Sequence, residues 1–204
     1  WYLSRLGHHV ALYGRSGSRR LEELKSTRTN GLVTLERNVE LTDQLIRAVE
    51  HAEVLVISIA SQSLSSLMAG LCALDLSGKM IVLCMKGIEA KTGKRLTEVV
   101  GGFVSEISTA IWVGPGHVQD FVSGVPNCMV IDSDSETVKE KLVRSFSSDL
   151  IRFYYGDDLI GNEIGAAAKN VIGIAAGMLD GLKKEALKGA LMSRGAREIA
   201  RLIM

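Results

Sequence analysis

The sequence predicts an α/β protein in which a mostly parallel sheet domain, residues 1–157, is followed by the start of an all-helical domain, residues 158–204. Two observations lead to this fold class. Short, continuous apolar runs alternate with helix-like segments up to residue 155, and such runs are typical of strands buried on both faces of a parallel sheet. From residue 159 onward the apolar pattern is helical without interruption.

The elements follow in order. Residues 1–7 read as the end of a helix that Gly7 stops. The apolar runs predict strands at residues 8–15, 54–60, 80–85, 109–113, 127–131 and 151–155. Segments with helical spacing separate them, at residues 18–25, 42–51, 62–74, 94–107 and 136–146. This alternation is why we expect one sheet with helical crossovers.

Composition excludes several functional classes. Apolar residues make up 47%, enough to bury a core, and 24 Lys and Arg nearly balance 23 Asp and Glu, so nucleic-acid binding is not indicated. Cys72, Cys84 and Cys128 have aliphatic neighbours and no metal-ligand spacing, which predicts buried free thiols, no metal site and a reducing compartment. Without a bilayer-length apolar run or a visible signal peptide, we expect a cytoplasmic protein. The abrupt ends at Trp1 and Met204 suggest a fragment.

One amine stands out in the helical segment 161–181. Gly161, Gly165, Lys169, Gly173 and Gly177 recur every four residues, so they advance about 40° per step around a helix. Because glycine costs roughly 1 kcal/mol of helix propensity, we expect a partner to pack closely along this stripe. Lys169 then faces that partner as a functional group. The alternative is a helix–helix packing stripe whose lysine reaches past the partner to water.

Ligands of open α/β sheets bind beyond the carboxyl ends of the strands, so the residues that follow each strand are the candidates. These segments are residues 14–16 (Gly-Arg-Ser), 60–62 (Ala-Ser-Gln), 86–87 (Lys-Gly) and 114–116 (Gly-Pro-Gly). Glycine, lysine and arginine suit a phosphate-bearing ligand, although ordinary turns explain the glycines alone. Lys86 is harder to explain by turn chemistry, because it directly follows an apolar strand.

Several of these motifs occur together and in one order. They are residues 85–89 (Met-Lys-Gly-Ile-Glu), 113–118 (Val-Gly-Pro-Gly-His-Val), 124–126 (Gly-Val-Pro), 146–148 (Phe-Ser-Ser) and 161–182 with Ala-Lys-Asn-Val at 168–171. In this combination the chain resembles the bacterial type of NAD(P)-dependent sn-glycerol-3-phosphate dehydrogenase. The resemblance implies a Rossmann-like domain, a helical domain and a cleft between them. It also implies reversible oxidation of sn-glycerol 3-phosphate to dihydroxyacetone phosphate, which feeds glycerophospholipid synthesis.

The resemblance assigns the substrate side of the site. Lys169 becomes the general base for the substrate hydroxyl, and Lys86 contacts substrate and cofactor. Gly114 and Gly116 line the substrate pocket, although the family usually has Ser or Thr at the latter position. Asn170 holds the lysine or the cofactor amide, or else makes an interhelical hydrogen bond. A lysine acts as a base near neutral pH only if burial or a nearby cation weakens its hold on the proton, and Lys86 would be such a cation.

On the cofactor side, the resemblance places Arg15 near the adenosine end and Val118, where the family usually has alanine, on the nicotinamide side. The basic cluster after residue 13 carries no carboxylate, so we expect NAD(P) with NADP(H) somewhat favoured. The family's Gly-rich loop is expected before Trp1, and its second phosphate-binding cluster beyond residue 204. A homodimer is implied by resemblance alone.

Two alternatives stay open at this point. One is another dehydrogenase of the same architecture, of the ketopantoate or 3-hydroxy-acid type. The other is a non-catalytic nucleotide-binding module.

Overall fold

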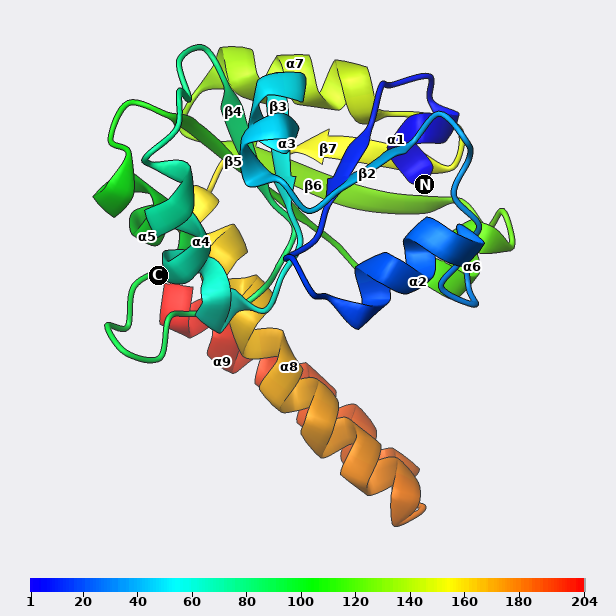
Figure 1. The fold of residues 1–204 in the computed structure, drawn as a ribbon. Helices are drawn as coiled ribbons and strands as arrows, with labels where there is room; N and C mark the ends of the chain where they lie inside the picture. The colour runs from blue at the N-terminus through cyan, green and yellow to red at the C-terminus, as the bar shows by residue number, and fades with distance from the viewer. Residues whose placement is uncertain (204) are drawn as a thin grey trace.

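The chain folds into three layers, helices on both faces of a sheet, from which a helical hairpin projects (Figure 1). A computed structural model describes residues 1–203, and Met204, the last residue of the predicted helical domain, lies outside the described residues. The strands are β1 Ala11–Tyr13, β2 Glu40–Thr42, β3 Val54–Ile57, β4 Met80–Leu83, β5 Ser108–Val113, β6 Asn127–Ser133 and β7 Ile151–Tyr155. The helices are α1 Tyr2–Arg5, α2 Arg19–Thr27, α3 Leu45–His51, α4 Leu64–Leu71, α5 Leu96–Phe103, α6 Val118–Val122, α7 Glu136–Phe146, α8 Leu159–Gly181 and α9 Glu185–Ile203.

The main sheet has the order β3-β4-β5-β6-β7. All neighbours run parallel except β5 and β6, which pair antiparallel, so the predicted mostly parallel sheet is confirmed. The expectation of a single sheet is wrong for the described residues, because β1 pairs in parallel with β2 and these two strands form a sheet of their own.

Strand β4 shows why the sheet is buried on both faces. Ile81 and Leu83 point into a core that α3, α4 and α5 build on one face. Met80 and Val82 point into a second core that α7 and β7 complete on the other face. All four side chains are buried, which is the pattern that the continuous apolar run predicted.

Two short elements differ from the sequence prediction. Thr42 closes β2 instead of opening a helix, and its hydroxyl accepts a hydrogen bond from Gln44 N at 3.1 Å, so α3 begins only at Leu45. Helix α6 was not predicted, and it starts at Val118, the residue that the resemblance places on the nicotinamide side. By contrast, α7 and β7 have the predicted bounds.

The prediction that all three cysteine side chains are buried is wrong for two of them. Cys72, which follows α4, and Cys128 on β6 are exposed, whereas Cys84 is partly buried just after β4. Burial raises the pKa of the Cys84 thiol to about 12. Apolar neighbours in sequence therefore did not indicate which side chains face the core.

Helices α8 and α9 pack side by side as the projecting hairpin, coloured orange and red in Figure 1. Close packing along the glycine stripe is confirmed only near the sheet: a methyl group added at Gly161 would lie 2.7 Å from Ile203 Cγ2. One added at Gly173 or Gly177 would meet no atom of residues 1–203 within 4 Å, so the expectation is wrong there. The stripe drifts around α8 and turns away from α9. Across residues 1–203, no helix has the length and apolar character of a membrane span.

Candidate active site at the carboxyl edge of the sheet

Lys86 lies just beyond the carboxyl end of β4, where the backbone leaves the sheet. Its ammonium group donates a hydrogen bond to the carbonyl oxygen of Gly114, 3.3 Å away in the loop after β5. Burial lowers the pKa of Lys86 below the ordinary lysine value, and the adjacent Lys169 amine lowers it further through a hydrogen bond and charge repulsion. Two predicted site residues and the backbone of a third therefore meet at one point.

The loop that carries Lys86 is held by the preceding crossover. Gly87 has a φ of +140°, a conformation that favours glycine, and an added Cβ would lie only 2.8 Å from Ser61 Oγ. The side-chain amide of Gln62 donates to the Ile88 carbonyl at 2.8 Å and accepts from the Ala90 N–H at 2.8 Å. The backbone after β4 is thus fixed on two sides, which orients Lys86.

Helix α8 brings Lys169 to this edge. The helix begins at Asp158, whose side chain caps it by accepting a hydrogen bond from Gly161 N at 2.8 Å. Asn162, in the first turn, donates to the buried carboxylate of Asp132 on β6 at 2.7 Å. Lys169 follows two turns later, is exposed, and lies close enough to hydrogen-bond the Lys86 amine.

A second set of polar contacts, made by the residue after Asn162, holds the same turn. Glu163 accepts hydrogen bonds from Arg95 Nη1 at 2.7 Å and from Thr97 N at 3.0 Å, at the start of α5. Only 6% of the Glu163 side chain is exposed. The first turn of α8 is therefore tied both to β6 and to α5.

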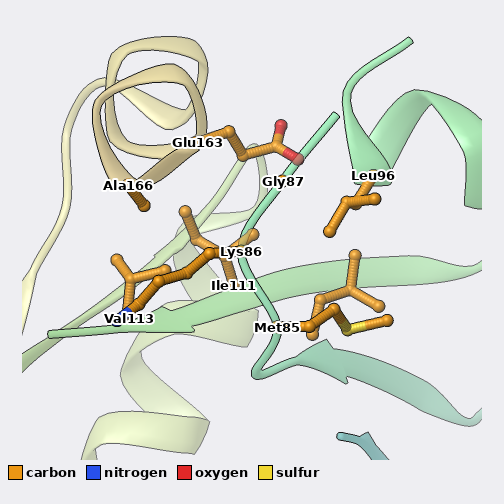
Figure 2. Close-up of a pocket in the computed structure, with 9 residues that line it drawn as sticks. Met85, Lys86, Gly87, Leu96, Ile111, Val113, Glu163 and Ala166 are labelled. Carbon is orange, nitrogen blue, oxygen red and sulfur yellow. The ribbon is translucent and has the colours of Figure 1, made fainter. Parts of the chain in front are cut away.

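A small pocket lies between these elements. Its lining includes Lys86 and Gly87 from the loop after β4, Val113 at the end of β5, Leu96 from α5, and Glu163 and Ala166 from α8. In Figure 2, Glu163 and Ala166 project from α8 over the segment that holds Lys86 and Gly87. The pocket therefore opens where the sheet, α5 and α8 converge.

Neither Lys169 nor the remaining predicted residues line this pocket. Gly116 is enclosed by Met129 and Phe121, so closely that an added Cβ would lie 2.0 Å from Met129 Cε. Val118 is 45% exposed at the start of α6. Asn170 is exposed beside Lys169, and Arg15 is exposed after β1; neither lines the pocket.

Sequence reasoning missed the residues that fix α8. Glu163 is the one carboxylate in residues 159–179, a helical segment of mostly small and aliphatic residues, six residues before Lys169, and that isolated charge was a usable signal. Its partners Arg95 and Thr97 had no such signal, because they lie more than sixty residues away in the chain.

Comparison with known proteins places this arrangement in a family. Residues 1–139 match the family described as NAD-dependent glycerol-3-phosphate dehydrogenase N-terminus, and residues 158–204 match the corresponding C-terminus. The glycerol-3-phosphate dehydrogenase, NAD(P)+, of Pelodictyon phaeoclathratiforme is 36% identical over 174 residues, 83% of this chain and 52% of that protein. The enzyme of that name from Thermoanaerobacter sp. is 33% identical over 98% of this chain and 62% of its own length.

Solved structures share the fold. The glycerol-3-phosphate dehydrogenase of Coxiella burnetii superimposes with a TM-score of 0.92 at 24% identity, over 99% of this chain and 63% of that one. A ketopantoate reductase, described as putative, from Ralstonia solanacearum superimposes less well, with a TM-score of 0.58 at 13% identity over 95% of this chain and 70% of that one. The chain thus spans between half and two thirds of the length of these three glycerol-3-phosphate dehydrogenases. With both halves of the family matched in order, the chain belongs to the NAD-dependent glycerol-3-phosphate dehydrogenase family.

Proposed function

We propose that this protein is an oxidoreductase that interconverts sn-glycerol 3-phosphate and dihydroxyacetone phosphate with NAD(P), as a step that feeds glycerophospholipid synthesis. The observation that carries the proposal is the approach of Lys169, from the family's C-terminal part, to Lys86, from its N-terminal part, whose amine also donates to the Gly114 carbonyl. Two amines at the carboxyl edge of a parallel sheet suit a small phosphorylated substrate.

Lys169 is proposed as the catalytic base. In the oxidative direction it removes the proton of the substrate hydroxyl, and in the reductive direction the protonated amine returns it. Lys86, one hydrogen bond away, contributes positive charge beside Lys169 and near the substrate. NAD(P), when bound, supplies the hydride acceptor or donor; the protein's part is to orient the reactants and balance charge. Gly114, Gly116 and Asn170 are proposed to border the substrate.

The cofactor is proposed to lie along the carboxyl edge toward β1. Arg15 and Arg19 are exposed there, beside the nine-residue helix α2, whose N-cap Ser18 accepts from Leu21 N. Exposed guanidinium groups near a helix N-terminus favour the phosphates of a dinucleotide, so the residues present fit this group. Lys86 and Val118 are proposed to contact its nicotinamide end.

Domain bounds, assembly and location are proposed together. We assign residues 1–157 to NAD(P) binding and residues 158–204 to the start of the catalytic helical domain, since the family's C-terminal match begins at residue 158, where Asp158 caps α8, and its N-terminal match ends before that point, at residue 139. A homodimer and a cytoplasmic location rest on family resemblance. Light scattering in solution tests the dimer: twice the chain mass supports it, and a single-chain mass rejects it.

Substrate specificity provides the direct test. NAD(P)H oxidation by the protein is followed with dihydroxyacetone phosphate, with ketopantoate and with a 3-oxo acid. We expect turnover with dihydroxyacetone phosphate alone, because the match to this family is stronger than the shared fold with a ketopantoate reductase. Preference for either other substrate would overturn the proposal, and cofactor binding without any turnover would favour a non-catalytic module.

A further inference from the structure

Glu163 is a buried carboxylate to which the proposed reaction gives no part. Both of its oxygens are used: Oε2 accepts from Arg95 Nη1 at 2.7 Å and from Thr97 Oγ1 at 2.5 Å, and Oε1 accepts from Thr97 N at 3.0 Å. A carboxylate with 6% exposure and three donors has little freedom to move. It is therefore a fixed point on α8.

The partners of Glu163 are themselves fixed. Arg95 is the N-cap residue of α5, and its backbone N–H donates to Glu98 Oε2 at 2.9 Å. Helix α5 is anchored in turn by the buried side chains of Leu96 and Val100 in the core under the sheet. The carboxylate of Glu163 thus ties α8 to the layer that also supports the strands carrying the site.

The spacing along α8 transmits this restraint to Lys169. Glu163, Ala166 and Lys169 follow one another at intervals of three residues on α8. Each interval rotates about 60° less than a full helical turn, and the two intervals together place Lys169 roughly 9 Å along the helix axis from Glu163. Glu163 and Ala166 line the pocket together with Lys86 (Figure 2). The Lys169 amine lies near enough to Lys86 to lower its pKa. A rotation of α8 at Glu163 would move Lys169 with it.

Arg95 has a second effect on the site. The Glu163 carboxylate and Lys86 line the same pocket, yet among residues 1–203 the carboxylate forms its ion pair with Arg95 and not with Lys86. A carboxylate paired to Lys86 would compete with the substrate for that amine. By forming the ion pair with Glu163, Arg95 therefore keeps this carboxylate away from the Lys86 amine, which stays free to contact the substrate.

We propose that Glu163, held by Arg95 and Thr97 at the start of α5, is a positioning residue that sets the place of Lys169 against Lys86. The inference rests on the proposed function for its catalytic consequence, and on the contacts of Glu163 for its geometry. Removal of the carboxylate should let the first turns of α8 shift while Lys169 itself remains present.

Chemical cross-linking measures the geometry without any reaction. A short bifunctional aryl fluoride bridges neighbouring amines, and peptide mass spectrometry reports the yield of the Lys86–Lys169 link. We expect a several-fold lower yield in Glu163→Ala and an intermediate yield in Glu163→Gln, which keeps the length and part of the hydrogen bonding. The control is Tyr2→Phe, which loses a partly buried hydrogen bond to the Phe146 carbonyl, beside the core on the other face of the sheet, and should keep the parent yield.

Kinetics of the protein give the second readout. In Glu163→Ala, kcat with dihydroxyacetone phosphate should fall by up to about 100-fold, since a misplacement near 1 Å can cost that much, with a smaller change in KM. Tyr2→Phe should keep kcat.

A parent-like cross-linking yield in folded Glu163→Ala, or an equal loss of cross-linking yield in Tyr2→Phe, would overturn the inference. If Glu163→Ala does not fold, a parent-like yield in Glu163→Gln overturns it. A parent protein that never reduces dihydroxyacetone phosphate refutes the proposed function, and cross-linking then decides the positioning role alone.

Discussion

Replacing Gly114 by alanine should destabilise the protein and disturb the hydrogen bond of Lys86. A Cβ at Gly114 would lie 2.7 Å from Met129 Cγ and 3.0 Å from Met129 Cα. The Cα belongs to β6, whose pairing with β5 ends next to Gly114 at Val113, so it cannot retreat without disturbing the sheet. Overpacking of this kind costs about 1–3 kcal/mol. In a domain of this size each kcal/mol lowers Tm by roughly 2–4 °C, so we expect a decrease of about 4–8 °C for a cost of 2 kcal/mol.

Thermal unfolding followed by circular dichroism measures the change, and Gly101→Ala is the matched control. Gly101 lies inside α5, and an alanine side chain there meets no atom of residues 1–203 within 4 Å. Relief of the glycine penalty should stabilise that variant by about 0.5–1 kcal/mol. Replacement of glycine by alanine is thus expected to lower the stability of the protein at position 114 and to raise it at position 101. A Tm for Gly114→Ala at or above that of the parent would refute the close approach of β6 to this loop.

Three further perturbations test other parts of the structure. Lys169→Met should raise the pKa of Lys86 toward its ordinary value, because burial remains but the hydrogen bond and the like charge disappear; pH-dependent amine labelling measures it. Because the pKa of Lys86 is lower in the folded protein, the unfolded chain binds more protons at alkaline pH below the ordinary lysine pKa. The free energy of unfolding of the parent should therefore rise with pH across that range, and it should rise less in the variant. An equal dependence of the unfolding free energy on pH in both proteins would contradict this coupling. With a thiol reagent at neutral pH, Cys128 should react in the folded protein and Cys84 only after unfolding, and early labelling of the latter would contradict its burial. Gly156→Ala should destabilise by about 1–3 kcal/mol in urea unfolding, because its Cβ would lie 2.3 Å from a buried carboxyl carbon on β6, and an unchanged midpoint would refute that contact.

The sequence predicted those elements whose pattern is long and uninterrupted. Strand β4, apolar at every position, and helix α7, with its amphipathic face and Ser135 cap, were both anticipated. Strand β2 was not, since three residues that include Glu40 and Thr42 carry no apolar run, and its pairing with β1 depends on residues far apart in the chain. Short elements are decided by tertiary contacts that local pattern does not contain.

Some residues of the candidate site could likewise be predicted from the sequence, and others could not. Lys86 and Lys169 could be singled out because each is a lone amine in an apolar setting, and the topology of a parallel sheet brings strand ends together. The ion pair between Glu163 and Arg95 could not, because its two residues are 68 positions apart in the chain and meet only through tertiary structure. The same holds for Gly116, where local sequence does not reveal that Met129 and Phe121 fill the space a side chain would take.

Turnover by Lys169→Ala tests the proposed role of this amine most directly. The side chain is exposed on α8, so its loss should leave the fold intact. With dihydroxyacetone phosphate and NAD(P)H, we expect the parent to oxidise the cofactor and the variant to show no measurable turnover, while cofactor binding, followed by fluorescence, is retained. Turnover close to that of the parent would contradict the assignment of Lys169 as the catalytic base.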